Sequence, residues 1–494
     1  MPILVLLLIP LVASAASLLL RNLRRMEAAY LVSAAGAFAA AVWLAAQVLA
    51  KGVVEWAGGF FYADHLSALV ALLTAFVYLA AAPYAVGYFR RDVEQEVFGN
   101  GQTGAKLRKY YALTPLFAFS MLLVAVSNNL GVLWIAVEST TLASIFLVTF
   151  YGRRTSLEAA WKYAILGGVG LSMALFGTVL TYYTAHQVLG GESLSVLNWS
   201  VLAGSAAHFD PTVMRLSFIL VLLGFGTKAG LAPMHTWKPD AYSEAPAPVA
   251  ALMATAVVNC ALYALARFYV LTERCVGPAF VSQLLIIFGL LSIGIAVPFI
   301  LIQRSYRRLL AYSSIDHGGI MALSLGFGGA LGALGMLLHM TFHSVTKPLL
   351  FFCAGNAQQH TGNDALKKGP GGLLHSLPVS APMFLLAALA VTGTPPFSMF
   401  QSEFTVLRAG FAAQRTAAVA LFVAFVIAIF CGFFYHIANL VLGPPADLPR
   451  GEFSRWKTYP VIGLSLIVVV LGFWLPAPVY ALVDGAARIL AVQP

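Results

Sequence analysis

Long apolar runs follow one another from one end of the chain to the other, separated by short polar segments. A run of about 18 or more apolar residues has the length that an α-helix needs to cross roughly 30 Å of hydrocarbon. The pattern predicts an all-α polytopic membrane protein with about fourteen transmembrane helices. The predicted spans lie near residues 3–20, 28–49, 64–88, 110–128, 129–151, 162–186, 213–235, 247–271, 279–302, 308–327, 331–356, 379–400, 415–440 and 458–483.

The composition of the chain agrees with this pattern. Of the 494 residues, 60% are hydrophobic and 10% are charged. A water-soluble fold of this size would leave much of that apolar area exposed to solvent. The first run, PILVLLLIPLVASAASLLL, has no basic segment before it, so we interpret it as the first span rather than as a secretory signal peptide.

The net charge of +10 comes from basic residues that gather in alternate loops. By the positive-inside rule such loops face the cytoplasm. This distribution is typical of membrane topology rather than of nucleic-acid binding, and it predicts that both termini lie on the non-cytoplasmic side. The basic residues of these loops are Arg21, Arg24, Arg25, Arg90, Arg91, Lys106, Arg108, Lys109, Arg153, Arg154, Arg304, Arg307, Arg308, Lys367, Lys368, Arg450, Arg455 and Lys457.

The four cysteines are scattered, with no CxxC spacing. Cys260, Cys275, Cys353 and Cys431 therefore indicate neither an iron–sulfur cluster nor an obvious disulfide. We expect no cofactor in this chain.

A small set of ionisable residues lies inside the apolar runs. Each costs at least about 2.5 kcal/mol at the centre of a membrane helix, so an idle, unpaired placement is improbable. Static ion pairs are one interpretation, and a path for protons or ions through the membrane is the other. The residues are Glu138, Lys228, His339, His343, Lys347 and Glu403.

The segment HMTFHSVTK carries three of these residues at intervals of four, which places His339, His343 and Lys347 on one face of a helix. Two histidines at this spacing can bind a metal, but the sequence shows no third ligand and the lysine would repel a cation. Nor can they serve as opposite axial ligands of one haem. Because imidazole titrates near neutral pH, the stripe favours proton transfer, and we expect no metal.

Glu138 has no cation within reach on its own helix, so its partner must come from another helix, and Lys228 is the natural candidate. Such a pair would hold a proton on the lysine while the carboxylate is close and release it when the carboxylate moves away. The two groups would titrate as one coupled unit.

Two predicted spans contain helix-breaking residues. Lys228 precedes the sequence GLAP, and Gly393, Pro395 and Pro396 precede Glu403. Proline removes a backbone donor, so both spans should be interrupted at membrane depth. The alternative is that Gly and Pro are simply frequent in membrane helices.

The two broken helices are predicted to be numbers seven and twelve, each the fourth helix of a five-helix unit. An odd number of spans makes the two units run in opposite directions, as in inverted-repeat transporters. This interpretation divides the chain into helices 1–3 (1–109), a first inverted repeat (110–271), a second inverted repeat (272–443) and a C-terminal helix (444–494).

The stretch GTKAGLAPMHTWKPDAYSEAP resembles the signature of the antiporter-like, proton-translocating membrane subunits shared by respiratory complex I, Mrp-type sodium/proton antiporters and group 4 hydrogenases. The resemblance runs over nearly the whole chain, through YADHLSALV, WIAVEST, LEAAWKYAIL, RRLLAYSSIDHGGI, HMTFHSVTKPLLFFCAG and QSEF. It implies that the six intramembrane residues translocate protons. Asn259 departs from the family, because many members have a lysine there; the link between the halves would then depend on ordered water with His339, His343 or Lys347.

Within the family, NNLGVLWIAVESTTLASIFLVTFY, RTSLEAAWKYAIL and AYSSIDHGGI, which includes Asp316, look most like component F of hydrogenase-4 and formate hydrogenlyase complexes. This resemblance implies a non-redox subunit of an oxidoreductase complex in the cell inner membrane. Its partners would be other membrane subunits and a peripheral redox module, nickel-iron hydrogenase-like or NADH dehydrogenase-like. The alternatives are a proton pump like subunits M and N of an NADH-quinone oxidoreductase, an Mrp-type sodium/proton antiporter subunit and a component of an inorganic-carbon uptake pair.

Two groups near the predicted membrane surface stay open. His235, with Lys238, Asp240 and Glu244, is either a point of proton uptake or part of a solvated helix end. Lys162, beside Glu158, is interpreted as an interfacial residue whose ammonium reaches toward water; the alternative is a member of the relay.

Overall fold

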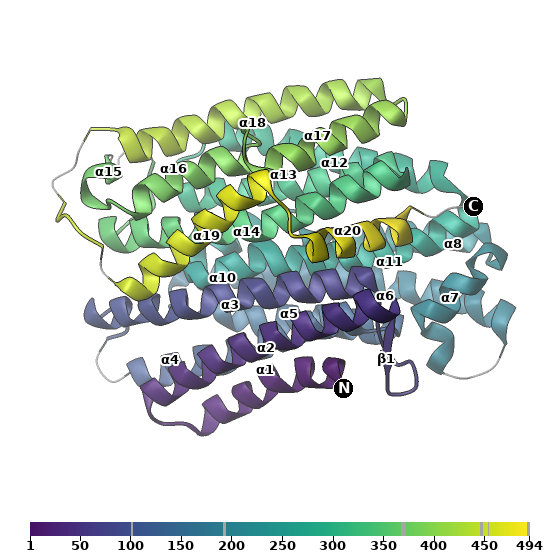
Figure 1. Cartoon of the computed structure of the whole chain (residues 1–494), viewed down its shortest axis with the longest axis horizontal. Helices are drawn as coiled ribbons and strands as arrows, with labels where there is room; N and C mark the ends of the chain where they lie inside the picture. Colours follow the sequence, from purple (N-terminus) through teal and green to yellow (C-terminus); the bar gives the residue numbers. More distant parts are fainter. Residues whose placement is uncertain (100–101, 191–193, 367–371, 445–447, 453, 492–494) are drawn as a thin grey trace.

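The structure is a computed structural model that describes residues 1–99, 102–190, 194–366, 372–444, 448–452 and 454–491. These residues form a bundle of long helices that run side by side, and both termini lie toward the end that carries a short β-hairpin (Figure 1). The all-α membrane fold is therefore confirmed. The predicted loop residues Lys367 and Lys368 lie outside the described residues.

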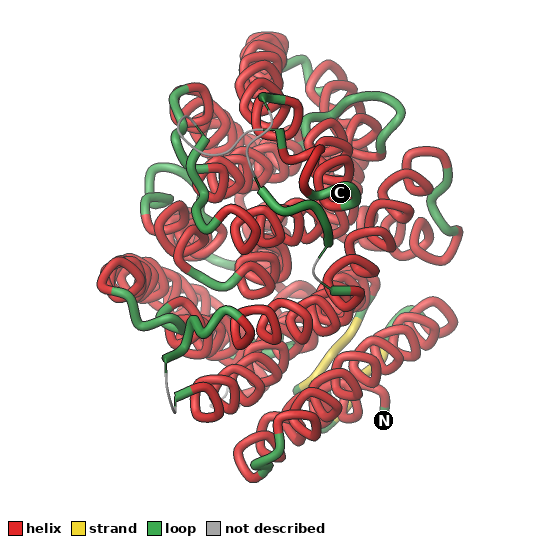
Figure 2. Tube along the Cα trace, turned by 90° about the vertical axis from the view of Figure 1, so that its left-hand side faces the viewer, coloured by secondary structure: helices red, strands yellow, loops and turns green. Residues whose placement is uncertain are grey.

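The described residues form twenty α-helices and one hairpin. The helices are α1 (Pro2–Leu19), α2 (Leu23–Lys51), α3 (His65–Glu94), α4 (Thr103–Val126), α5 (Leu130–Val148), α6 (Arg154–Leu189), α7 (Trp199–Ser205), α8 (Pro211–Ala229), α9 (Trp237–Glu244), α10 (Ala247–Leu252), α11 (Val258–Val276), α12 (Pro278–Leu301), α13 (Tyr306–Phe327), α14 (Gly329–Thr361), α15 (Leu373–Ser376), α16 (Ser380–Val391), α17 (Ser398–Ala412), α18 (Thr416–Leu442), α19 (Arg455–Phe473) and α20 (Ala477–Leu490). The strands β1 (Val54–Trp56) and β2 (Phe61–Ala63) pair antiparallel, and Figure 2 shows them beside the N-terminal helices.

Eleven of the described helices are long and apolar enough to cross a membrane, with α10 and α11 joined by a π-helical turn into one helix, Ala247–Val276. The predicted spans at 308–327 and 331–356 correspond to α13 and α14, which have 22 and 33 residues but bury many polar side chains. The predicted span at 379–400 corresponds to α16 and the start of α17. The total number of crossings stays a prediction.

Close packing of small residues sets the positions of two helix pairs. A Cβ on Gly224 of α8 would lie 2.5 Å from the Ala174 Cβ on α6, and a Cβ on Gly170 would lie 2.6 Å from Thr227. On the other side of the bundle, a Cβ on Gly289 of α12 would lie 2.7 Å from the backbone nitrogen of Leu323 on α13. Small residues allow membrane helices to approach in this way. The contact between α6 and α8 brings Thr227, and with it the next residue, against α6.

Both predicted interruptions are present. Helix α8 ends at Ala229 with Gly230 in the left-handed region (φ +76°), and α9 begins at Trp237. Helix α16 ends at Val391, and α17 begins at Ser398. Lys228 lies just before its break whereas Glu403 lies inside the helix that follows its break, so the two charges are not at equivalent places. The inverted relation of the two units stays a prediction.

A span is present in the region predicted at 458–483, because α19 is long and apolar enough to cross a membrane, but its predicted C-terminal end is wrong. Two helices, α19 and α20, occupy this region and are separated at Trp474–Pro476. Pro476 is the N-cap of α20, and Pro478 follows in its first turn, where the missing N–H of proline costs nothing.

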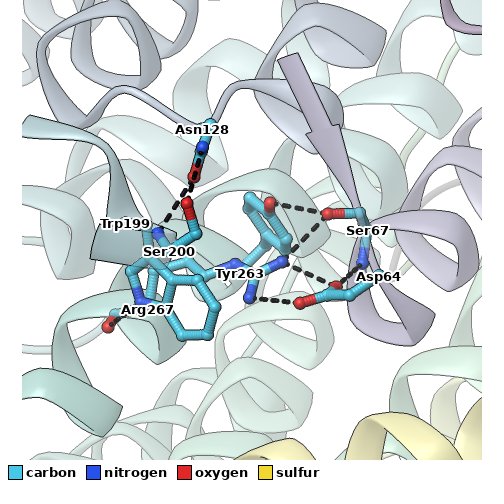
Figure 3. Close-up of polar contacts among 7 residues, drawn as sticks. All are labelled: Asp64, Ser67, Asn128, Trp199, Ser200, Tyr263 and Arg267. Carbon is cyan, nitrogen blue, oxygen red and sulfur yellow. Dashed lines mark hydrogen bonds and ion pairs between the residues drawn. The ribbon is translucent and has the colours of Figure 1, made fainter. Parts of the chain in front are cut away.

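A buried polar network fastens the hairpin end of the bundle (Figure 3). Asp64, the N-cap of α3, accepts two hydrogen bonds from the Arg267 guanidinium of α11, at 2.7 and 2.8 Å. The guanidinium also donates to the Ser67 hydroxyl and lies over the rings of Trp199 (4.2 Å) and Tyr263 (4.8 Å). This buried cation is therefore held by a full set of strong partners.

The same network ties in the connections between helices. Asn128, between α4 and α5, donates to the carbonyl oxygen of Gly59 in the hairpin and to the hydroxyl of Ser200 on α7. Trp199 on α7 donates from its indole nitrogen to the Arg267 carbonyl oxygen (2.9 Å). The network thus holds α3, α7, α11 and the hairpin in one arrangement.

Candidate functional site

Lys228 lies in the last turn of α8 and is buried. Its Nζ donates to the Tyr163 hydroxyl on α6 (2.6 Å) and to the Thr141 hydroxyl on α5 (2.7 Å). No carboxylate oxygen of the described residues lies within 4.0 Å of this nitrogen. The amine is thus held by neutral groups.

The partner Tyr163 is itself held by the segment that follows the break. Its ring stacks on Trp237 of α9 with centroids 4.5 Å apart, and its hydroxyl shares a hydrogen bond with Ser144 (2.8 Å). The Trp237 indole nitrogen donates to the Thr227 carbonyl oxygen (2.9 Å), which also accepts from the Gly230 N–H at the end of α8. The interrupted helix therefore folds back to support the residue that binds Lys228.

Glu138 lies on α5 and is half-buried, and its Oε2 has no hydrogen-bond partner among the described residues. It makes no ion pair with Lys228 here, although the two charges are near enough to interact. Thr141, one turn further along the same helix, accepts the hydrogen bond from Lys228 instead. The coupled titration of the pair stays a prediction.

Lys238 on α9 corrects the interpretation of its segment as a solvated helix end. Its side chain is fully buried, and Nζ donates to the carbonyl oxygens of Ala229 (2.8 Å) and Ser314 (3.1 Å). His235 is also buried, and its Nδ1 lies 3.2 Å from the Pro233 carbonyl oxygen. The sequence obscured Lys238 because it stands just after the break, in a short segment that also carries His235 and Asp240.

The other end of the same segment does lie near the surface. Asp240 bonds Lys162 of α6 (3.1 Å) and also contacts Arg308 of α13. Lys162 additionally pairs with Glu158 (2.7 Å), and about half of its side chain is exposed. These contacts agree with an interfacial position for Lys162.

A chain of imidazoles occupies the second half of the bundle. His317 of α13 and His339 of α14 share a hydrogen bond between Nδ1 and Nε2 at 2.9 Å. The other nitrogen of His339 lies 3.0 Å from the Ser402 hydroxyl on α17. The His343 ring lies 5.3 Å from the His317 ring, and neither nitrogen of His343 has a hydrogen-bond partner among the described residues. Sequence reasoning does not single out His317, although the quoted motif SSIDHGGI contains it.

Lys347 continues this chain on α14. Its Nζ donates to the Ser313 hydroxyl (2.8 Å) and to the Leu310 carbonyl oxygen (3.3 Å), both on α13. Asp316 is buried nearby, with Oδ1 unpartnered among the described residues, and its charge interacts with those of Lys347 and Glu403. Asp316 therefore belongs with Lys347 and Glu403 among the buried titratable groups, whereas in the sequence it counted only as part of the resemblance to component F.

Glu403 lies on α17 against the break in the preceding chain. A Cβ on Gly393 would lie 2.1 Å from its Oε2, so only glycine fits at that position. The carboxylate also borders a largely apolar cavity of ≈ 360 Å³ between α17 and α18. The six predicted residues thus form two groups. The Lys228 side consists of Glu138 and Lys228, and the Glu403 side consists of His339, His343, Lys347 and Glu403.

The second half brings together a metal-ligand set that the sequence did not reveal. Ligand atoms of His317, His339 and Glu403 all lie within 4.8 Å of one another, a different set from the His339 and His343 pair considered in the sequence. However, the 2.9 Å hydrogen bond joins the two imidazoles directly through nitrogens that would have to turn toward an ion. The arrangement suits proton sharing better than metal binding.

Asn259, at the place where many family members have lysine, lies on α11 immediately after the π-helical turn. Its amide nitrogen donates to the Ser344 hydroxyl on α14 (2.7 Å), and its Oδ1 has no partner among the described residues. It therefore contacts the helix that carries His343 and Lys347, but it cannot titrate.

Comparison with known sequences decides the family. The sequence profile described as NADH:quinone oxidoreductase/Mrp antiporter, TM, matches residues 127–429. The chain belongs to this family. It is 36% identical over 421 residues to the hydrogenase-4 component F homolog of Methylacidiphilum infernorum, covering 85% of this chain and 86% of that protein. It is 31% identical over 428 residues to NADH-quinone oxidoreductase subunit N of Desulforudis audaxviator, covering 83% and 81%.

Solved structures share the fold of this antiporter-like subunit. A chain of the archaeal membrane-bound sulfane sulfur reductase superimposes with a TM-score of 0.86 at 24% identity, covering 99% of this chain and 97% of that one. A chain of the Mrp complex from Dietzia sp. superimposes with a TM-score of 0.84 at 20% identity, with the same coverage. These neighbours are subunits of multi-subunit membrane complexes.

Proposed function

We propose that this subunit carries protons across the cell inner membrane as part of a hydrogenase-4-like complex. The observation that supports this most is the set of buried titratable side chains inside the bundle, which comprises Lys228, Lys347, the hydrogen-bonded histidines and Glu403. Intramembrane ionisable residues that face the interior of a bundle are typical of proton relays.

The proposed route begins at the basic, cytoplasmic end of the bundle, near His235, and reaches Lys228. Glu138 acts as the gate, because its approach would retain the proton on Lys228 and its withdrawal would release it. The proton then passes through the His343 and Lys347 region to His317, His339 and Glu403. Ordered water would bridge the buried atoms along this route that have no hydrogen-bond partner among the described residues, on Glu138, Asn259, Asp316 and His343.

The proposal includes the partners and the topology. A peripheral redox module, nickel-iron hydrogenase-like or NADH dehydrogenase-like, supplies the energy, and neighbouring membrane subunits transmit it to Glu138. In this proposal both termini lie on the non-cytoplasmic side, which the positive-inside rule applied to the alternate basic loops supports. The likeness to subunit N of an NADH-quinone oxidoreductase favours the second kind of module as the alternative.

The test uses the tagged chain with the companions that copurify in mild detergent. We expect Lys228→Ala to reduce donor-driven proton translocation in vesicles by about 100-fold or more, because a positioned proton carrier is removed. Glu138→Ala should have a similar effect, and Lys51→Ala, at an exposed position on α2, serves as the control.

Normal pumping by the assembled Lys228→Ala variant would refute the proposal. The identity of the companions decides between the hydrogenase-like and NADH-oxidising modules. Sodium-dependent exchange in vesicles without an electron donor would instead assign the chain to an Mrp-type antiporter.

A further inference from the structure

Lys238 is a buried cationic residue that the route described above does not use. It is the second residue of α9, its side chain is fully buried, and no carboxylate oxygen of the described residues lies within 4.0 Å of its Nζ. Burying an ammonium without a counter-ion is costly, so the buried position of Lys238 calls for a functional reason.

The two hydrogen bonds of Lys238 link the two sides of the site. One accepting carbonyl belongs to Ala229, the residue after Lys228, and the other belongs to Ser314, one turn before His317 on α13. The side chain is confined on its way there, because a Cβ on Gly230 would lie 2.5 Å from the Lys238 Cδ. Its nitrogen is thus fixed between the broken end of α8 and α13.

The chemistry of this nitrogen suits proton exchange. A neutral amine has two N–H donors, which match the two carbonyls, and one lone pair that remains able to accept a proton. The ammonium form has three donors, so it keeps both carbonyl bonds and has one N–H to give away. Either form therefore satisfies the same two acceptors, and gaining or losing a proton requires no rearrangement.

The neighbours of Lys238 are the groups that a relay would need. Its charge interacts with those of His317, His343 and Lys347, from α13 and α14, and with His235 in the broken segment. Asn259 on α11 donates to Ser344 on α14, and its amide side chain does not titrate.

We propose that Lys238 transfers the proton from the Lys228 side to the imidazoles of the second half. The step rests on the proposed function. An N–H bond of the Lys228 ammonium breaks as one forms on the Lys238 amine, through water. An N–H bond of the resulting ammonium then breaks as the proton passes to His343 or His317, and Lys238 returns to the neutral amine.

The test compares Lys238→Arg and Lys238→Gln in the purified complex with its companions, reconstituted in proteoliposomes. Arginine can still donate to both carbonyls but does not deprotonate in proteins, and glutamine removes the charge. We expect both variants to copurify with the companions and to lose proton flux by about 100-fold, under donor and under an imposed membrane potential. Lys51→Gln is the control.

A second variant distinguishes a role of Lys238 in proton transfer from a purely structural role. Asn259→Lys in the Lys238→Gln background returns an amine to the face that bonds Ser344, next to His343, and should restore part of the flux. Wild-type flux in either assembled single variant would overturn the inference. If Lys228→Ala blocks flux while Lys238→Arg does not, only the Lys238 assignment fails; if Lys228→Ala also pumps normally, the proposed function fails with it.

Discussion

Two kinds of buried cationic site in this molecule are built in opposite ways. Arg267 meets a carboxylate through two hydrogen bonds, a hydroxyl through a third, and two aromatic rings (Figure 3). The hydrogen bonds of Lys228, Lys238 and Lys347 go to hydroxyl and carbonyl oxygens. A guanidinium stays charged in proteins, whereas a lysine amine can exchange its proton. The first kind is suited to permanent structure and the second to transfer.

The largest expected effect comes from breaking the permanent site. Asp64→Ala leaves the Arg267 charge buried without a partner, and we expect the folded protein to lose about 3–5 kcal/mol of stability. The measurement is the denaturation midpoint of the purified complex in detergent. Lys228→Met, which removes a cation without stranding an anion within ion-pair distance, is the matched comparison and should shift this midpoint far less. Equal shifts in the two variants would abolish the distinction between the sites.

A smaller effect is expected where the backbone makes room for a titratable group. In Gly393→Ala the new methyl group would collide with the Glu403 carboxylate, and the residue has φ +69°, which alanine adopts only at a cost of about 1–2 kcal/mol. Proton flux should fall because Glu403 is displaced from His317 and His339. Gly463→Ala on α19, where a Cβ would meet nothing within 4 Å, is the control. Unchanged flux in Gly393→Ala would show that the position of Glu403 is unimportant.

The smallest effect concerns one of the neutral partners of an amine. Thr141→Val keeps the shape of the side chain but removes the hydroxyl that accepts from Lys228, which costs about 1 kcal/mol. We expect a reduction of flux by about fivefold, since Tyr163 still holds the amine. Serine at the same position should retain the wild-type rate. A Thr141→Val variant as inactive as Lys228→Ala would mean that the hydroxyl itself carries the proton.

Hydropathy predicted the fold well because membrane helices must satisfy their backbone internally and therefore form long apolar runs. Proline and glycine predicted the interruptions around Gly230 and at 392–397, and the same reasoning applied to Pro476 and Pro478 would have found the break before α20. The hairpin was missed because its strands have three residues each and carry no membrane-length pattern.

The site was only partly predictable. Glu138, Lys228 and Glu403 stand out because a charge in an apolar run is expensive. Lys238 and Asp64 lie in polar-looking segments at helix ends, and only the folded chain shows that both are buried. His317 gains its meaning from a nitrogen on another helix, a relation that no spacing within one helix can encode.

The two-turn helix α9 has a mechanical consequence. Trp237 supports the ring of Tyr163, the next residue is Lys238, and Asp240 is anchored to α6 through Lys162 and to α13 through Arg308. A tilt of α9 would displace Tyr163, which accepts a hydrogen bond from Lys228, and would move Lys238 at the same time. A displacement of α6 or of α13 would then change the positions of both amines together.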